Sequence, residues 1–119
     1  MHKTINGWTK EKMIAHIKAE FKGKSENGAI CLYRGPEGKK CAVGMFIPED
    51  LYRKNMDTEN GNGGIGAKWI IEKFKLQDIM PLDNLGMGCL QFCHDQSIPS
   101  ETLSDIIRWI DTNVEANNS

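Results

Sequence analysis

The chain has 119 residues and a mass of 13.4 kDa, a size that suits one domain with a buried core. Its 39% hydrophobic and 26% charged residues are typical of a folded globular protein and exclude whole-chain disorder. No apolar run approaches the roughly 20 residues of a membrane span. The sequence pI of about 6.3 argues against a dedicated duplex-DNA binder.

The charge is unevenly divided along the chain. Residues 1–40 carry nine Lys and Arg against four Asp and Glu, whereas residues 41–119 carry six against twelve. This division is compatible with a solvated surface on which charges cluster by chance. It is also compatible with a basic N-terminal part that steers an anionic ligand or attracts the acidic C-terminal part of a second copy.

The first predicted element is a helix over residues 10–22. Thr9 can accept hydrogen bonds from the first free N–H groups, and Gly23 supplies the positive φ that often ends a helix. The apolar residues between them recur at helical spacing: Met13, Ile14, Ile17 and Phe21.

A β-hairpin is predicted over residues 29–47. The strand formers of residues 29–33 and the apolar run of residues 40–47 flank a turn that contains Gly35, Pro36 and Gly38. An isolated hairpin leaves its edges open, so we expect a homo-oligomer, most simply a two-fold dimer.

Helices are predicted over residues 66–114, with Asp83 capping one and Pro99 opening the last. Within the helix that follows Asp83, Gly86 and Gly88 each cost about 1 kcal/mol relative to Ala. The predicted fold class is therefore α+β: one helix-dominated domain, residues 1–119, with one β-hairpin.

Four cysteines without a secretory signal are expected to be reduced. Cys31 and Cys41 lie on facing arms of the predicted hairpin, where they pack the core, bind metal or take part in redox or catalytic chemistry. Their spacing is too wide for a zinc knuckle, and we expect no metal. Cys89 and Cys93 are four residues apart on one helix face, where filling the core is the simpler interpretation.

Gln91, His94 and Asp95 close the same helix. Gln91 and His94 share a helix face, whereas adjacent residues such as His94 and Asp95 do not normally face each other. His94 therefore has three interpretations: a cation at the negative end of the helix dipole, a ligand contact, or a catalytic base oriented by Asp95.

The chain resembles a family of small phage and prophage proteins. The resemblance rests on Tyr33-Arg34-Gly35-Pro36-x-Gly38-x-Lys40-Cys41-Ala42-Val43-Gly44, on Ile47-Pro48-x-Asp50-x-Tyr52, and on Leu90-Gln91-x-x-His94-Asp95. The family pattern reads C-x-Y-R-G-P-D-G-x-K-C-A-V-G, then M-E-G, then L-Q-x-x-H-D. This chain departs from it at Met56-Asp57, and the pattern has no counterparts of Cys89 and Cys93.

The resemblance does not itself name an activity. Small phage accessory proteins of this size often act by binding, so by association we expect a protein that acts in the host cytoplasm, without a cofactor, against a host defence system. It would sequester a nucleotide-type ligand or inhibit a host protein. For a nucleotide, Tyr33, Arg34 and Lys40 would contact the anion, and Gln91 and His94 would read a base or ribose edge. Asp95 is expected to bind the ligand beside them. The alternatives are a small hydrolase that uses the Cys41 thiol with His94 and Asp95, and a structural component of the phage.

Overall fold

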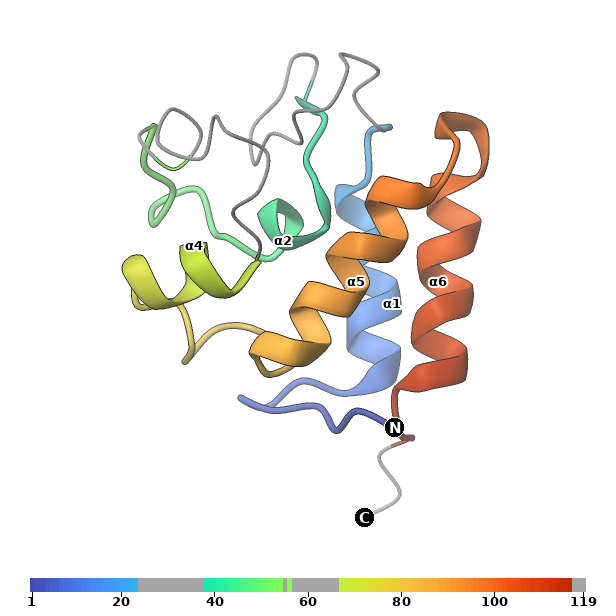
Figure 1. Cartoon of the computed structure of the whole chain (residues 1–119), viewed down its shortest axis with the longest axis horizontal. Helices are drawn as coiled ribbons and strands as arrows, with labels where there is room; N and C mark the ends of the chain where they lie inside the picture. The colour runs from blue at the N-terminus through green and yellow to red at the C-terminus, as the bar shows by residue number, and fades with distance from the viewer. Residues whose placement is uncertain (24–37, 55, 57–66, 117–119) are drawn as a thin grey trace.

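The structure is a computed structural model, and it describes residues 1–23, 38–54, 56 and 67–116. Within these residues the chain is built from helices (Figure 1). In chain order they are α1 (Lys10–Glu20), α2 (Ala42–Met45), α4 (Ala67–Lys73), α5 (Asn84–Gln96), the 3-10 helix η2 (Pro99–Glu101) and α6 (Thr102–Asn113).

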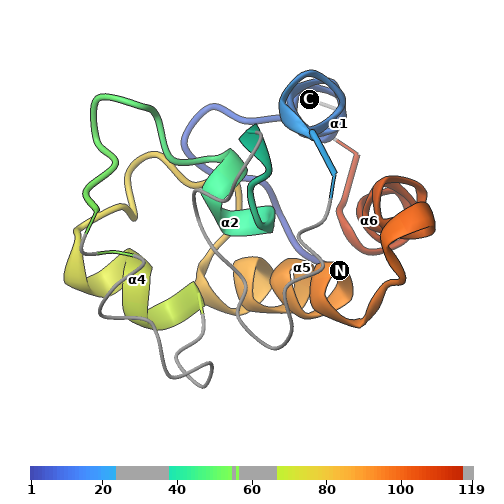
Figure 2. The same cartoon turned by 90° about the horizontal axis from the view of Figure 1, so that it is seen from above.

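Helix α5 is the centre of the arrangement, because α2, α4 and α6 all pack against it. Helices α1 and α6 lie side by side. In the view from above, these two are seen along their axes and α5 is seen from the side, so α5 crosses them (Figure 2). The core fills the space between these helices and includes Met13, Ile17, Met45, Ile70, Leu90 and Ile110.

The N-terminal helix begins where the sequence predicts. Thr9 Oγ1 accepts a hydrogen bond from Lys12 N at 3.1 Å, which satisfies one of the free donors of the first turn. The helix ends at Glu20 rather than residue 22, and Phe21 is already extended. Met13 and Ile17 are buried on its inner face.

The predicted α+β class with one β-hairpin is wrong. No strand is present in the described part of the chain, and residues 42–45 of the second predicted arm form helix α2. The first arm lies outside the described residues. The sequence misleads here because residues 41–47 are all buried, and a continuous apolar run carries no periodicity that separates a strand from a buried helix.

The two ends of the described chain are fastened to the helical body. His2 forms an isolated parallel bridge with Val114, through His2 N to Asn113 O at 2.7 Å and Glu115 N to His2 O at 2.8 Å. Asn6 Nδ2 donates to the carbonyls of Gln77 and Met80. Among the described helices, none is both long and apolar enough to cross a membrane.

Two glycines in the first half of α5 have opposite environments. A Cβ at Gly86 would lie 2.8 Å from Leu82 Cβ, whereas a Cβ at Gly88 would meet no heavy atom within 4 Å. We expect Gly88→Ala to raise the free energy of unfolding by about 1 kcal/mol. Gly86→Ala gains the same helix propensity but must displace Leu82, so a net loss of about 1 kcal/mol is expected. Urea unfolding of both variants at low protein concentration checks this; equal effects would contradict it.

Candidate functional site

Of the six residues predicted to bind a ligand, Tyr33 and Arg34 lie outside the described residues. The structure places Lys40 just before α2, and Gln91, His94 and Asp95 in the second half of α5. Helices α2 and α5 pack together. The helix that carries Gln91, His94 and Asp95 therefore contacts the helix that follows Lys40.

Lys40 contacts two carboxylates. Its Nζ lies 3.5 Å from Glu20 Oε1 and 3.5 Å from Glu49 Oε1, and its side chain is only 14% exposed. A phosphate that approached this ammonium would also approach both carboxylates. The environment of Lys40 therefore opposes the predicted contact with an anion.

Gln91 joins α5 to the beginning of α2. Its Oε1 accepts a hydrogen bond from Val43 N at 3.0 Å, and its Nε2 donates to Asp95 Oδ1 at 2.8 Å. The first contact satisfies one of the free N–H groups in the first turn of α2. The amide oxygen of Gln91 thus joins α2 to α5, whereas its amide nitrogen makes a contact within α5.

His94 and Asp95 are in contact, although neighbours on a helix do not normally face each other. His94 Nδ1 lies 3.1 Å from Asp95 Oδ1, and because a carboxylate oxygen accepts, this contact places a proton on Nδ1. The His94 side chain is buried, including its Nε2 atom. The expectation that these two side chains point apart is therefore wrong.

Cys41 is buried and reduced at the N-cap position of α2, and Cys31 lies outside the described residues. Gln91 accepts a hydrogen bond from Val43 N, two positions beyond Cys41. Because Gln91, His94 and Asp95 all lie on α5, the helix that carries the His94–Asp95 pair contacts the segment that follows Cys41. The hydrolase alternative stays a prediction. The described residues contain no group of three potential metal ligands.

A pocket of about 400 Å³ opens on another side of α2, between α1 and the segments around Pro48 and Ile79. Three aromatic rings contact one another at this pocket: Trp8, His16 and Phe46, with centroids 5.0 to 5.3 Å apart. His16 and Phe46 are stacked, and Trp8 meets both edge-on. Hydrogen bonds hold the first two rings in place, from Trp8 Nε1 to Ile79 O at 3.1 Å and between His16 Nε2 and Met45 O at 2.6 Å.

Among the described residues, the charged side chains that line this pocket are all acidic: Glu20, Glu49 and Asp78. Glu20 and Glu49 are the two carboxylates that hold the ammonium of Lys40. Carboxylates beside aromatic rings form an environment that attracts cations through both ion pairing and the ring faces. We call it the aromatic–acidic pocket.

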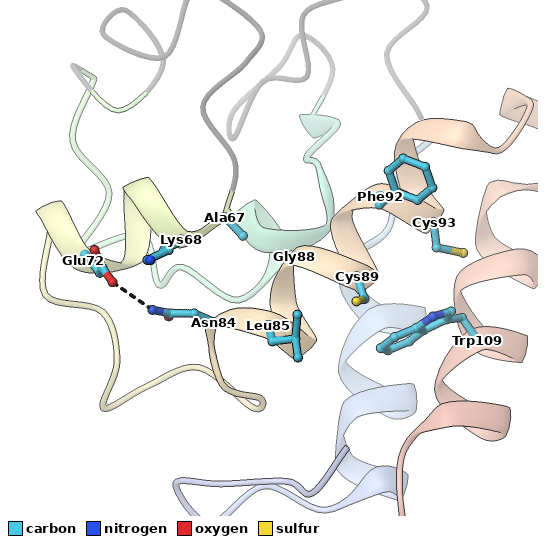
Figure 3. Close-up of a pocket in the computed structure, with 10 residues that line it drawn as sticks. All are labelled: Ala67, Lys68, Glu72, Asn84, Leu85, Gly88, Cys89, Phe92, Cys93 and Trp109. Carbon is cyan, nitrogen blue, oxygen red and sulfur yellow. Dashed lines mark hydrogen bonds between the residues drawn. The ribbon is translucent and has the colours of Figure 1, made fainter. Parts of the chain in front are cut away.

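A second hollow, of about 890 Å³, lies over α4, α5 and α6 on the outer side of α5 (Figure 3). Leu85, Phe92 and Trp109 contribute most of its apolar character, and Lys68 and Glu72 lie at the α4 end. Cys89 and Cys93 are both half-buried and line this groove, and Cys93 also packs against the core.

The thiol of Cys93 is a poor nucleophile in this setting. Burial and then the charge of Asp105 raise its pKa above the ordinary value, and Sγ lies 3.6 Å from Asp105 O, which accepts from it. Cys93 is therefore a protonated thiol at neutral pH.

Sequence reasoning missed the aromatic–acidic pocket. Trp8, His16 and Phe46 are far apart in the sequence and carry no shared spacing, so only the ring contacts of the folded chain reveal them. The one available signal was the excess of apolar residues around Phe46. Comparison with known proteins finds no matching family model, no matching curated protein and no matching solved structure.

Proposed function

We propose that this chain is a phage-encoded accessory protein that acts in the host cytoplasm against a host system, by binding a host protein. The aromatic–acidic pocket receives a basic side chain of that protein, an arginine or a lysine. The observation that carries the proposal is the combination of three carboxylates with three contacting aromatic rings around one pocket.

The charges favour a protein target over a nucleotide. A nucleotide phosphate would meet Glu20, Glu49 and Asp78 in the pocket, and the Lys40 ammonium is already shared between two carboxylates. A guanidinium or ammonium gains from the same groups, because charge-assisted hydrogen bonds and ring faces both stabilise it. Lys40 itself demonstrates that Glu20 and Glu49 accommodate a cation.

The experiment is affinity capture from a lysate of the bacterial host with the tagged chain as bait. Replacing Glu49→Lys together with Asp78→Lys reverses two exposed charges at the pocket and is expected to abolish capture of the specific partner. Glu101→Lys reverses an exposed acidic residue in η2 and is the matched control. Capture that survives the double reversal contradicts the proposal.

Lys40→Met separates the two classes of ligand. If a basic side chain occupies the pocket, removing the Lys40 ammonium leaves Glu20 and Glu49 available to the ligand, and capture is retained or strengthened. If Lys40 contacts a nucleotide phosphate, the same variant loses binding. A nucleotide released intact from the wild-type protein and absent from Lys40→Met would support the nucleotide reading and overturn ours.

A further inference from the structure

The N–H groups in the lining of the aromatic–acidic pocket give it a second property. Among the described residues, only Asn6, Trp8 and His16 bring side-chain N–H donors to this lining, and no lining side chain carries a hydroxyl, an ammonium or a guanidinium. An amide, an indole and an imidazole can each donate a hydrogen bond to a ligand. The groups to which they already donate therefore decide which ligands the pocket accepts.

All of these donors are bound to backbone carbonyls. Asn6 Nδ2 uses both of its N–H groups, on Gln77 O at 2.6 Å and on Met80 O at 2.8 Å. The indole of Trp8 and the Nε2 atom of His16 also contact backbone carbonyls, at 3.1 and 2.6 Å. Because a carbonyl accepts, the His16 contact places the imidazole proton on Nε2, and in the neutral ring Nδ1 is an acceptor. With that ring neutral, the lining side chains keep no N–H group for a ligand.

The lining side chains thus offer a ligand acceptors and aromatic rings. The carboxylates come from three separate segments: Glu20 ends α1, Glu49 follows α2, and Asp78 lies between α4 and α5. A phosphate, a carboxylate or a carbonyl that entered the pocket would find no side-chain donor. A guanidinium or an ammonium carries donors and no acceptor, so it complements this lining. One ammonium is already present, because Lys40 Nζ lies 3.5 Å from both Glu20 and Glu49.

We propose that the aromatic–acidic pocket is specific for an unmodified arginine side chain, which it recognises by its N–H groups and not by charge alone. The inference rests on the proposed function, since it names the side chain that the host protein contributes. A second ammonium would compete with Lys40 for the same oxygens. A guanidinium presents five donors in a planar fork, which can divide them between these carboxylates and Asp78. It is also more weakly hydrated than an ammonium and stacks on aromatic rings, so it loses less on entering beside Trp8 and Phe46.

Peptides of equal charge test this specificity. The ligands are blocked Gly-Xaa-Gly peptides in which Xaa is arginine, asymmetric dimethylarginine, lysine or trimethyllysine, and each dissociation constant is measured from the nuclear magnetic resonance signal of the Trp8 indole N–H. Arginine is expected to bind at least about tenfold more tightly than lysine. Each methylated residue is expected to bind at least about tenfold more weakly than its unmodified form, because methylation keeps the charge and removes donors.

The possible results separate this inference from the proposed function. A lysine peptide that binds as tightly as the arginine peptide overturns the inference and leaves the proposed function standing. So does a trimethyllysine peptide that binds as tightly as the lysine peptide, because the pocket then recognises charge alone. If no cationic peptide shifts the Trp8 signal, the proposed function fails and the inference fails with it.

Asp78→Asn tests the lining from the side of the protein. The variant replaces an acceptor-only group by an amide of the same shape that brings N–H donors into the pocket, and it is expected to weaken binding of the arginine peptide at least about tenfold. Circular dichroism should not change, because Asp78 is exposed. The matched control is Asp50→Asn, which makes the same change at an exposed residue outside the lining and should bind as the wild type does. Equal affinities of the two variants for the arginine peptide would overturn the inference.

Discussion

Leu90→Ala is expected to lower the free energy of unfolding by about 2–5 kcal/mol, the range for removing a fully buried leucine. Leu90 is completely buried on the inner face of α5, the helix against which α2, α4 and α6 all pack. Truncation removes contacts and leaves a cavity that three helices cannot readily close. Urea unfolding measures the loss as a lower midpoint with an unchanged slope.

The matched control is Leu85→Ala, which makes the same change five positions earlier in the same helix. Because Leu85 is exposed in the single chain, this variant should change the unfolding free energy by no more than about 0.5 kcal/mol when measured at low protein concentration. Similar losses for the two variants would contradict the assignment of the inner and outer faces of α5.

Gln91→Leu is expected to cost about 1–3 kcal/mol, although Gln91 is only partly buried. The variant leaves Val43 N without the Gln91 acceptor and removes the amide donor to Asp95. Since the Val43 contact holds the first turn of α2 against α5, the amide proton of Val43 should also exchange faster with solvent.

Gln96→Leu, the same substitution at an exposed position at the end of α5, should leave both the stability and the exchange of Val43 close to wild type. The pair of variants also tests the role of the Gln91-x-x-His94-Asp95 pattern in this chain. If Gln91→Leu is as stable as wild type and the Val43 amide remains protected, the structural role given to Gln91 is wrong.

The predictable parts of this fold are those with local signals. Thr9 and Asp83 cap their helices as expected, because a capping side chain and the N–H that it accepts from are three residues apart. The apolar stripe of α6 is likewise periodic, with Ile106 and Ile110 one turn apart and buried. Such signals are contained within one turn of helix.

The unpredictable parts depend on contacts between distant segments. The run around Val43 is apolar without a period, and the Gln91 amide that stabilises its helical form lies 48 residues away. The contact between His94 and Asp95 depends on side-chain rotamers, which spacing alone does not reveal. The rings of Trp8 and Phe46 likewise meet only in the folded chain, because they are 38 positions apart in the sequence.

The proposed function of the candidate site therefore differs from the sequence prediction, with a cation contact in place of an anion contact. The prediction used Lys40 as a positive charge available to a nucleotide, a reasonable reading of its position in a basic stretch. The structure surrounds that charge with Glu20 and Glu49 and adds Asp78 to the same pocket. The spacing of residues in the sequence predicts neither contact of Lys40 with a carboxylate, because Glu20 and Glu49 lie in other segments of the chain.

A nuclear magnetic resonance titration of the three tryptophan indole N–H signals distinguishes a pocket that binds cations from one that binds nucleotides. Trp8 lies at the aromatic–acidic pocket, Trp109 lines the groove over α5, and Trp69 packs against Phe74, so each signal reports on a different place. The ligands are a blocked Gly-Arg-Gly peptide, its Gly-Glu-Gly counterpart and ATP. Only the arginine peptide is expected to shift the Trp8 signal, with the Trp69 and Trp109 signals unchanged, and Glu49→Lys with Asp78→Lys is expected to remove the shift. A Trp8 signal that responds to ATP and ignores the arginine peptide would contradict the proposed function.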